Sequence, residues 1–157
     1  MALKIADLIK AARIRELPMR KNIVVKPTTP LEEVYRLMDE GDWSAVVVCK
    51  GDKAVGIFSH RDILYRTALE DLEPSTPIEQ LMTPDPVTLS IDEGLPAAIK
   101  VMVDGGYRHI PIIDDKGCTA GVLTSREILR YIADHMPETV LNLPPRLHQE
   151  LHRPEGG

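Results

Sequence analysis

The sequence predicts an α/β fold of the α+β type, in which two tandem β-α-β-β-α units pack sheet to sheet with pseudo-two-fold symmetry. The first supporting observation is a strand-to-helix corner, GIFSHRDIL at Gly56–Leu64, that returns as GVLTSREIL at Gly121–Leu129. The second is that matching residues keep a nearly constant separation along the chain. The third is size, because a unit this small leaves an apolar sheet face exposed unless a second copy covers it.

The separation between matching residues is 64 positions before the hairpin of each unit and 65 positions after it. One extra residue in the second hairpin accounts for the change. The pairs at 64 positions include Ile14/Ile78, Leu31/Leu95, Met38/Met102 and Gly41/Gly105, and those at 65 include Gly56/Gly121, Arg61/Arg126 and Leu64/Leu129. Chance similarity between two α/β segments is the alternative, and the conserved order of the matches over the whole unit argues against it.

Hydrophobic spacing and turn residues predict the elements of the first unit and of the segment that precedes it. An apolar stripe predicts a helix over Ala2–Leu17, which ends before Pro18. A strand follows at Ile23–Val25, then a helix at Leu31–Glu40 with Thr29 as N-cap, Pro30 at the first helical position and Gly41 as the stop. Two strands, Ser44–Cys49 and Ala54–Phe58, are joined by a turn at Lys50–Lys53, and Ser59 caps a helix that extends to about Ala68.

The second unit repeats this order after an acidic, proline-containing linker at Glu70–Pro77. Its expected elements are a short helix Ile78–Met82, a strand Pro86–Leu89, a helix Leu95–Asp104 that ends at Gly105-Gly106, strands Tyr107–Ile113 and Thr119–Leu123, and a helix Arg126–His135. The predicted boundaries are an N-terminal helix at 1–12, units at 13–70 and 78–136, a linker at 71–77, and a flexible tail at 137–157.

Composition limits the possible partners. Of the 157 residues, 43% are hydrophobic, which is enough for a core without metal or disulfides, and the net charge of −5 disfavours duplex DNA and anionic membranes. Cys49 and Cys118 form no C-x-x-C pair, which indicates a reducing compartment. The sequence starts with no secretory leader and has no long apolar run, so we expect a cytoplasmic protein.

The repeated corner carries a hydroxyl residue followed three positions later by a carboxylate, Ser59 with Asp62 and Thr124 with Glu127. Backbone N–H groups at a helix N-terminus bind phosphate, and a carboxylate can accept both hydrogen bonds of a ribose diol. The same spacing is also that of a capping box, which would stabilise each helix by about 1 kcal/mol and need no ligand. The residues alone leave both interpretations open.

Cations near the corners suit a phosphorylated ligand, namely His60, Arg61, Arg108, His109 and Arg126. Arg108 and His109 also fit a solvated strand end, and Trp43 is interpreted as a plug at the sheet edge rather than a base-stacking platform. His148 and His152 lack a third ligand, so no metal site is expected. The sequence contains no Walker loop, no G-x-S-x-G and no H-E-x-x-H, and we therefore predict a protein without catalytic activity.

Three stretches, WSAVVVCKGDKAVGIFSHRDIL, YRHIPIIDDKGCTAGVLTSREIL and MTPDPVTLSIDEGLPAAIKVM, resemble a cystathionine-β-synthase (CBS) domain pair, or Bateman module, over residues 13–136. The resemblance implies an adenosyl ligand between the units: AMP, ADP or ATP, with NAD and S-adenosylmethionine as further candidates. It gives Asp62 the ribose role. The expected contacts comprise Asn22, Val24, Ala45, Val47, Ser59, His60, Arg61, Asp62, Thr83, Val87, Arg108, His109, Pro111, Thr124, Arg126 and Glu127.

The two corners are expected to bind a ligand unequally. Glu127 departs from the aspartate of the family pattern, so ribose binding is expected to favour the Asp62 corner, while Thr83 is assigned to the phosphate lining of the second corner. The helix Leu95–Asp104 is apolar nearly all round, which, with the family resemblance, predicts a homodimer. The expected function is a regulatory sensor that changes its affinity for a protein partner in trans. The alternatives are a ligand-free interaction module and, less favoured, a small enzyme.

Overall fold

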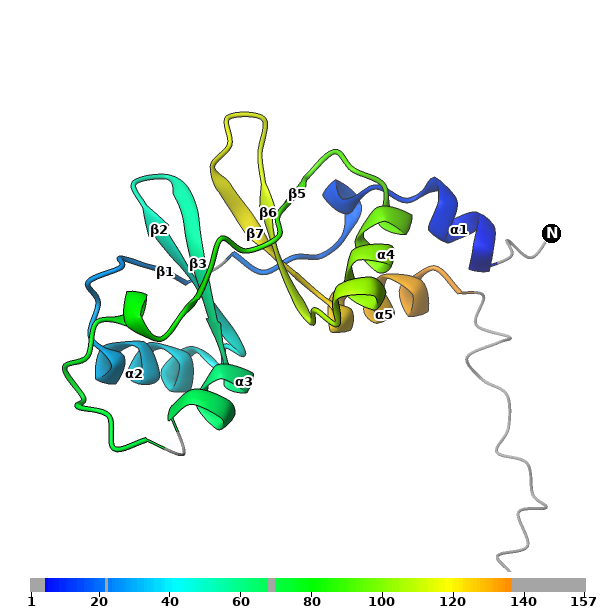
Figure 1. Cartoon of the computed structure of the whole chain (residues 1–157). Coiled ribbons are helices and arrows are strands. Elements are labelled where there is room, and N and C mark those ends of the chain that lie inside the picture. The colour runs from blue at the N-terminus through cyan, green and yellow to red at the C-terminus, as the bar shows by residue number, and fades with distance from the viewer. Residues whose placement is uncertain (1–4, 22, 68–69, 137–157) are drawn as a thin grey trace, which may run out of the picture.

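The computed structural model describes residues 5–21, 23–67 and 70–136 (Figure 1). The first half contains α1 (Ile5–Ala11), η1 (Ile14–Glu16), β1 (Val24–Val25), α2 (Leu31–Gly41), β2 (Ala45–Lys50), β3 (Lys53–Ser59), α3 (His60–Asp62) and η2 (Ile63–Thr67). The second half contains η3 (Ile78–Gln80), β4 (Thr83–Pro84), β5 (Leu89–Ser90), α4 (Leu95–Gly105), β6 (His109–Ile113), β7 (Thr119–Thr124) and α5 (Ser125–Asp134). The order β-α-β-β-α occurs twice, as predicted.

Each unit builds its own small sheet. In the first sheet β1 pairs parallel with β2, β2 pairs antiparallel with β3, and β3 pairs antiparallel with β4. In the second sheet β5 pairs parallel with β6, and β6 pairs antiparallel with β7. Strand β4, which the sequence did not predict, aligns Thr83 with Ile57 and Pro84 with Gly56. The start of the second repeat therefore completes the sheet of the first.

The segment that precedes each unit is buried in the core of the other unit. Ile14 and Leu17 are buried with Leu95, Ile110 and Leu123, which belong to the second unit. Their repeat equivalents do the reverse, because Ile78 and Leu81 are buried with Val34, Val46 and Phe58 of the first unit. Both isoleucines are fully buried. Figure 1 shows the resulting path, in which the chain enters each half from the side of the other.

The two sheets meet through a small apolar cluster. Val47 and Cys49 of β2 are buried together with Val122 of β7, and the thiol of Cys49 lies 3.4 Å from the hydroxyl oxygen of Thr119. Figure 1 shows the β2–β3 and β6–β7 hairpins side by side with helices on their outer sides. This arrangement agrees with the predicted packing of sheet against sheet.

The predicted helix over Ala2–Leu17 is wrong in its length. Helix α1 ends at Ala11, and Ile14–Glu16 form a separate 3₁₀ turn, while residues 1–4 lie outside the described part. Arg13 is extended (φ −108°, ψ 150°) and bridges to Gly94. The N–H of Ile14 donates to the carbonyl of Glu93 at 2.9 Å. Tertiary hydrogen bonds therefore replace the helical ones at this point.

The helix predicted at Leu31–Glu40 begins at Leu31 as expected, but the residues assigned to its cap and its stop differ. Thr29 is not the N-cap, because Pro30 occupies that position and the hydroxyl of Thr29 accepts a hydrogen bond from the N–H of Lys26 at 3.0 Å. Gly41 does not stop the helix, since Asp42 supplies the left-handed residue with φ of 50°. Gly41 is required for another reason: a Cβ atom there would overlap the indole of Trp43.

Three further boundaries are corrected. Only Leu89–Ser90 form a strand where Pro86–Leu89 was expected, because this segment crosses between the sheets before it pairs with β6. The helix expected at Ile78–Met82 is a 3₁₀ turn at Ile78–Gln80. The helix after Ser59 widens into a π-helical turn at Ile63–Thr67, where the Thr67 hydroxyl donates to the Ile63 carbonyl at 2.6 Å. The predicted flexible tail, 137–157, lies outside the described residues.

Candidate functional site

Each strand-to-helix corner uses one carboxylate oxygen to cap its own helix. The N–H and the hydroxyl of Ser59 donate to Oδ2 of Asp62 at 2.9 and 3.0 Å. The N–H of Thr124 donates to Oε2 of Glu127 at 3.0 Å, and the Thr124 hydroxyl donates to the same oxygen. Capping is therefore realised at both corners, and only the second carboxylate oxygen of each remains to be assigned.

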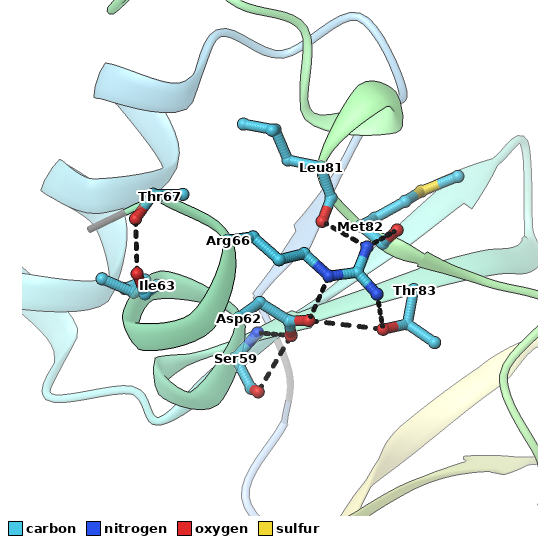
Figure 2. Close-up of polar contacts among 8 residues, drawn as sticks. All are labelled: Ser59, Asp62, Ile63, Arg66, Thr67, Leu81, Met82 and Thr83. Atoms are coloured by element: carbon cyan, nitrogen blue, oxygen red, sulfur yellow. Dashed lines mark hydrogen bonds and ion pairs between the residues drawn. The ribbon is translucent and has the colours of Figure 1, made fainter. Parts of the chain in front are cut away.

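The second oxygens of the two carboxylates differ. Oδ1 of Asp62 accepts a hydrogen bond from the hydroxyl of Thr83 at 3.3 Å and lies 3.4 Å from Nε of Arg66 (Figure 2). Within residues 5–21, 23–67 and 70–136, no protein donor reaches Oε1 of Glu127. The structure thus leaves Glu127 better able to accept a ligand hydrogen bond than Asp62, opposite to the ranking expected from the sequence.

Thr83 lies at the first corner, so its assignment to the second corner is corrected. The reason is the antiparallel pairing of β4 with β3, which places Thr83 opposite Ile57 and beside Asp62. The sequence repeat could not reveal this, because Thr83 follows the linker and reads as the start of the second unit. Thr83 lies on the same segment as Ile78, which is buried in the core of the first unit.

A cleft of about 370 Å³ opens between the units beside the second corner, a size at the small end of ligand pockets. Its walls come from both units. The residues that line it are Arg20, Asp42, Trp43, Ser44, Ala45, His60, Arg108, His109, Val122, Thr124, Ser125, Arg126, Glu127 and Arg130. Seven of these were predicted from the sequence, namely Ala45, His60, Arg108, His109, Thr124, Arg126 and Glu127.

The other predicted contacts lie outside this lining. Val47 and Pro111 are fully buried, so their side chains cannot meet a ligand without rearrangement. Ser59, Arg61, Asp62 and Thr83 belong to the first corner, whereas Val24 and Val87 are exposed apolar residues of other segments. Asn22 lies outside the described residues.

The cleft is cationic although the whole chain carries a charge of −5. Four arginines line it, Arg20, Arg108, Arg126 and Arg130, and only two carboxylates, those of Asp42 and Glu127, oppose them. A concave site with one dominant sign of charge concentrates ligands of the opposite sign. The N-terminus of α5 adds backbone N–H groups at the same place. The cleft is therefore suited to an anion.

His109 connects the two units across the cleft. Its Nε2 lies 2.7 Å from the hydroxyl oxygen of Ser44, which precedes β2 of the first unit. Burial lowers the pKa of His109 below its usual value, and the nearby charges of His60 and Arg108 lower it further, while Glu127 opposes them. The imidazole is accordingly neutral at pH 7 and serves as a hydrogen-bonding group rather than a cation.

Trp43 forms part of the cleft wall, whereas the sequence interpretation favoured a plug at the sheet edge over a base-stacking platform. The guanidinium of Arg20 stacks over its ring at 3.9 Å and donates to the carbonyls of Gly41 and Asp42 at 3.1 and 3.3 Å. Arg20 comes from the segment before β1, which no spacing rule connects to the second corner. Only the folded arrangement shows that this segment contributes to the cleft.

Neither a cluster of metal ligands nor a membrane-spanning helix is found among the described residues. Among its residues, no group of three or more His, Cys, Asp or Glu side chains could hold a metal ion, and His148 and His152 lie outside it. None of its helices combines the length and the apolar character that a membrane crossing requires.

Comparison with known proteins gives a consistent result. The family model described as "CBS domain" matches residues 14–68 and 78–134. An uncharacterized protein of Methanopyrus kandleri is 28% identical over 145 residues, which cover 91% of this chain and 74% of that protein. An uncharacterized 17.7 kDa protein of Acidianus ambivalens is 30% identical over 125 residues, which cover 79% of this chain and 75% of that protein.

Solved structures share the fold. An uncharacterized conserved protein from Pyrococcus horikoshii has a TM-score of 0.70 and 31% identity, and the match covers 78% of this chain and 92% of that chain. A CBS domain protein from Pyrobaculum aerophilum, complexed with AMP, has a TM-score of 0.69 at 23% identity, covering 78% and 99%. The domain pair of MJ0100, in complex with 5′-methylthioadenosine and S-adenosylmethionine, has a TM-score of 0.68 at 20% identity, covering 78% and 97%.

Proposed function

The chain belongs to the CBS domain family, and we propose that it is a regulatory module that binds a phosphorylated adenosine nucleotide in the cleft beside Glu127. Three features support this site. The cleft carries four arginines, it lies at the N-terminus of α5, and Oε1 of Glu127 lacks a partner within the described residues. Family membership supports an adenosyl ligand, because structural neighbours were solved with AMP, or with 5′-methylthioadenosine and S-adenosylmethionine.

The proposed binding mode assigns one ligand part to each kind of group. The phosphates lie against the guanidinium groups of Arg108 and Arg126 and the first N–H groups of α5. The ribose diol donates to Oε1 of Glu127, and the adenine packs between Trp43 and Val122, which both line the cleft. No step of this arrangement needs a metal ion or a covalent bond, in keeping with a binding module rather than an enzyme.

Charge separates the candidate ligands. AMP, ADP and ATP bring two to four negative charges to the arginines, so we rank them first. S-adenosylmethionine carries a sulfonium cation, which the arginines repel by the same rule. NAD has two phosphates but a second nucleoside, and a cleft of about 370 Å³ favours the smaller mononucleotides. The main support for a phosphorylated ligand is therefore the excess of arginine in this cleft.

Regulation would follow because the ligand contacts both units at once. Ser44, Ala45 and His60 come from the first unit and Arg108 and Glu127 from the second, so a ligand in the cleft favours one relative orientation. A ligand shifts such an equilibrium only by its difference in affinity for the two orientations. We propose that a protein partner in trans reads this orientation, in a cytoplasmic setting.

A homodimer also remains a proposal, although part of the apolar surface expected on α4 is used within the chain. Ile99, Val101 and Met102 of α4 pack against their own core, and Val103 is the exposed large apolar residue of that helix. Other exposed apolar side chains lie in η2 and α5, namely Leu64, Tyr65 and Leu129. Light scattering after size exclusion tests the dimer: a mass of 17.5 kDa at micromolar concentration contradicts it.

Calorimetry with AMP, ADP, ATP, NAD, adenosine and S-adenosylmethionine tests the proposed ligand class. We expect the phosphorylated mononucleotides to bind, with affinity that falls as salt rises. Glu127→Gln exchanges a charged acceptor for a neutral one, which weakens binding by roughly tenfold. Arg108→Met should weaken ATP binding, whereas Arg36→Met, an identical change at an exposed residue of α2, should not. Equal affinity for adenosine and ATP would refute the role of the arginines.

A ligand-free interaction module is the second candidate, and the capping bonds favour it. Both Asp62 and Glu127 already cap their helices, a structural task that requires no nucleotide. The two candidates separate in a thermal shift assay. A ligand at 100 times its dissociation constant stabilises the folded state by about 2.7 kcal/mol. If no adenosyl compound raises the melting temperature, the interaction module replaces the sensor.

A further inference from the structure

We infer that the chain closes its own Asp62 corner with Arg66 and Thr83, so that each chain binds a single nucleotide, beside Glu127. This inference rests on the proposed function for the identity of the ligand. The closure itself is a property of the protein alone. It concerns residues of η2 and β4, neither of which lines the cleft.

The guanidinium of Arg66 binds the crossing segment and the corner together (Figure 2). Its Nη1 donates to the carbonyl of Leu81 at 3.2 Å and to that of Met82 at 3.1 Å. Its Nη2 donates to the hydroxyl of Thr83 at 3.5 Å, and its Nε lies 3.4 Å from Oδ1 of Asp62. One side chain thus fills the space between the Asp62 carboxylate and the segment that a ligand at this corner would also contact.

A count of acceptor positions shows why this arrangement excludes a ribose. A carboxylate offers about four lone-pair positions, two on each oxygen. Ser59 donates twice to Oδ2 of Asp62, Thr83 donates to Oδ1, and Arg66 forms an ion pair with Oδ1. The Asp62 side chain is only 13% exposed. A diol could bind there only after Thr83 and Arg66 had moved away.

The second corner lacks both internal donors. The repeat places Met19 at the position of Thr83 and Tyr131 at the position of Arg66. A methionine side chain has no hydrogen to donate, and Tyr131 is buried in the core of the second unit. In the described part of the chain no hydrogen bond joins Glu127 to either residue. These two differences between the repeats leave the carboxylate of Glu127 available and that of Asp62 occupied.

The stoichiometry of ATP binding tests the closure. Wild type should bind one ATP per chain in calorimetry. Arg66→Met combined with Thr83→Val removes the ion pair and the hydrogen bond to Oδ1 of Asp62 at similar side-chain size and should raise the stoichiometry to two. Arg36→Met is the matched control, because Arg36 forms the same i,i+4 ion pair with Glu40 on the surface and should leave one site. Two sites in wild type, or one site in a folded double variant, would overturn the inference.

Amide hydrogen exchange gives a readout that needs no ligand. The N–H groups of Leu81 and Met82 donate to the carbonyl of Ile78 at 2.9 and 2.8 Å. Arg66→Met alone should speed their exchange several-fold, whereas Arg36→Met should not. Unchanged exchange would overturn the closure. Faster exchange, with no ATP bound by any variant, would support the closure and refute the proposed nucleotide function instead. If the double variant does not unfold cooperatively, Thr83→Val alone should show a weak second binding phase, and its absence would contradict the inference.

Discussion

Replacing Ile14 with valine tests whether the segment before the first unit stabilises the second unit. Ile14 is fully buried among Leu95, Ile110 and Leu123, and its repeat equivalent Ile78 is fully buried in the opposite core. Loss of one buried methylene typically lowers the free energy of unfolding by 0.5–1.5 kcal/mol. A loss of about 1 kcal/mol in the free energy of unfolding changes the equilibrium between the folded state and the opened state that exchanges its amide hydrogens about fivefold.

Native-state hydrogen exchange measures this change separately for each unit. Ile14→Val should speed exchange about fivefold in β6 and β7 and less in β2 and β3, and Ile78→Val should give the reverse pattern. The two variants are matched controls for one another, because they make the same chemical change at equivalent positions. A larger effect of Ile14→Val on β2 and β3 than on β6 and β7 would refute the burial of each preceding segment in the opposite unit, as would equal effects on both hairpins.

Three further predictions follow from single residues. Burial lowers the pKa of His109 in the folded protein below 6.5, the ordinary value that applies to the unfolded chain. Between the folded and the unfolded pKa, the unfolded chain binds more protons, so the stability of the folded protein falls as the pH drops through that range. His109→Gln should remove this part of the pH dependence, measured by urea unfolding from about pH 7.5 to about pH 5; an unchanged slope contradicts the assignment. Gly41→Ala would place a Cβ in the indole of Trp43, so the ring must move and the tryptophan emission should shift; identical emission would argue against the close packing. Cys49 is buried between the sheets and Cys118 is half-buried, so brief treatment with N-ethylmaleimide should modify Cys118 first, and peptide mapping would reveal the opposite order.

The repeat and the corners could be predicted from the sequence because they depend on local chemistry. Short apolar runs bounded by turn residues predicted the paired strands, and the two corners were located by a hydroxyl and a carboxylate three positions apart. The same reasoning found seven of the residues that line the cleft, since they lie next to the Thr124 corner or at matching strand ends. It failed at Thr29, whose hydroxyl accepts from Lys26 instead of capping the helix, and at Gly41, because the next residue, Asp42, takes the left-handed conformation.

The sequence by itself determined that this protein has two β-α-β-β-α units, each with a capped corner that carries a carboxylate. Only the tertiary structure decided which segment completes each core and which corner remains open. Thr83 reaches Asp62 through a strand pairing across 26 residues of chain, from Ile57 to Thr83. Such long-range pairing depends on how the two halves pack, and periodicity within one element contains no information about it.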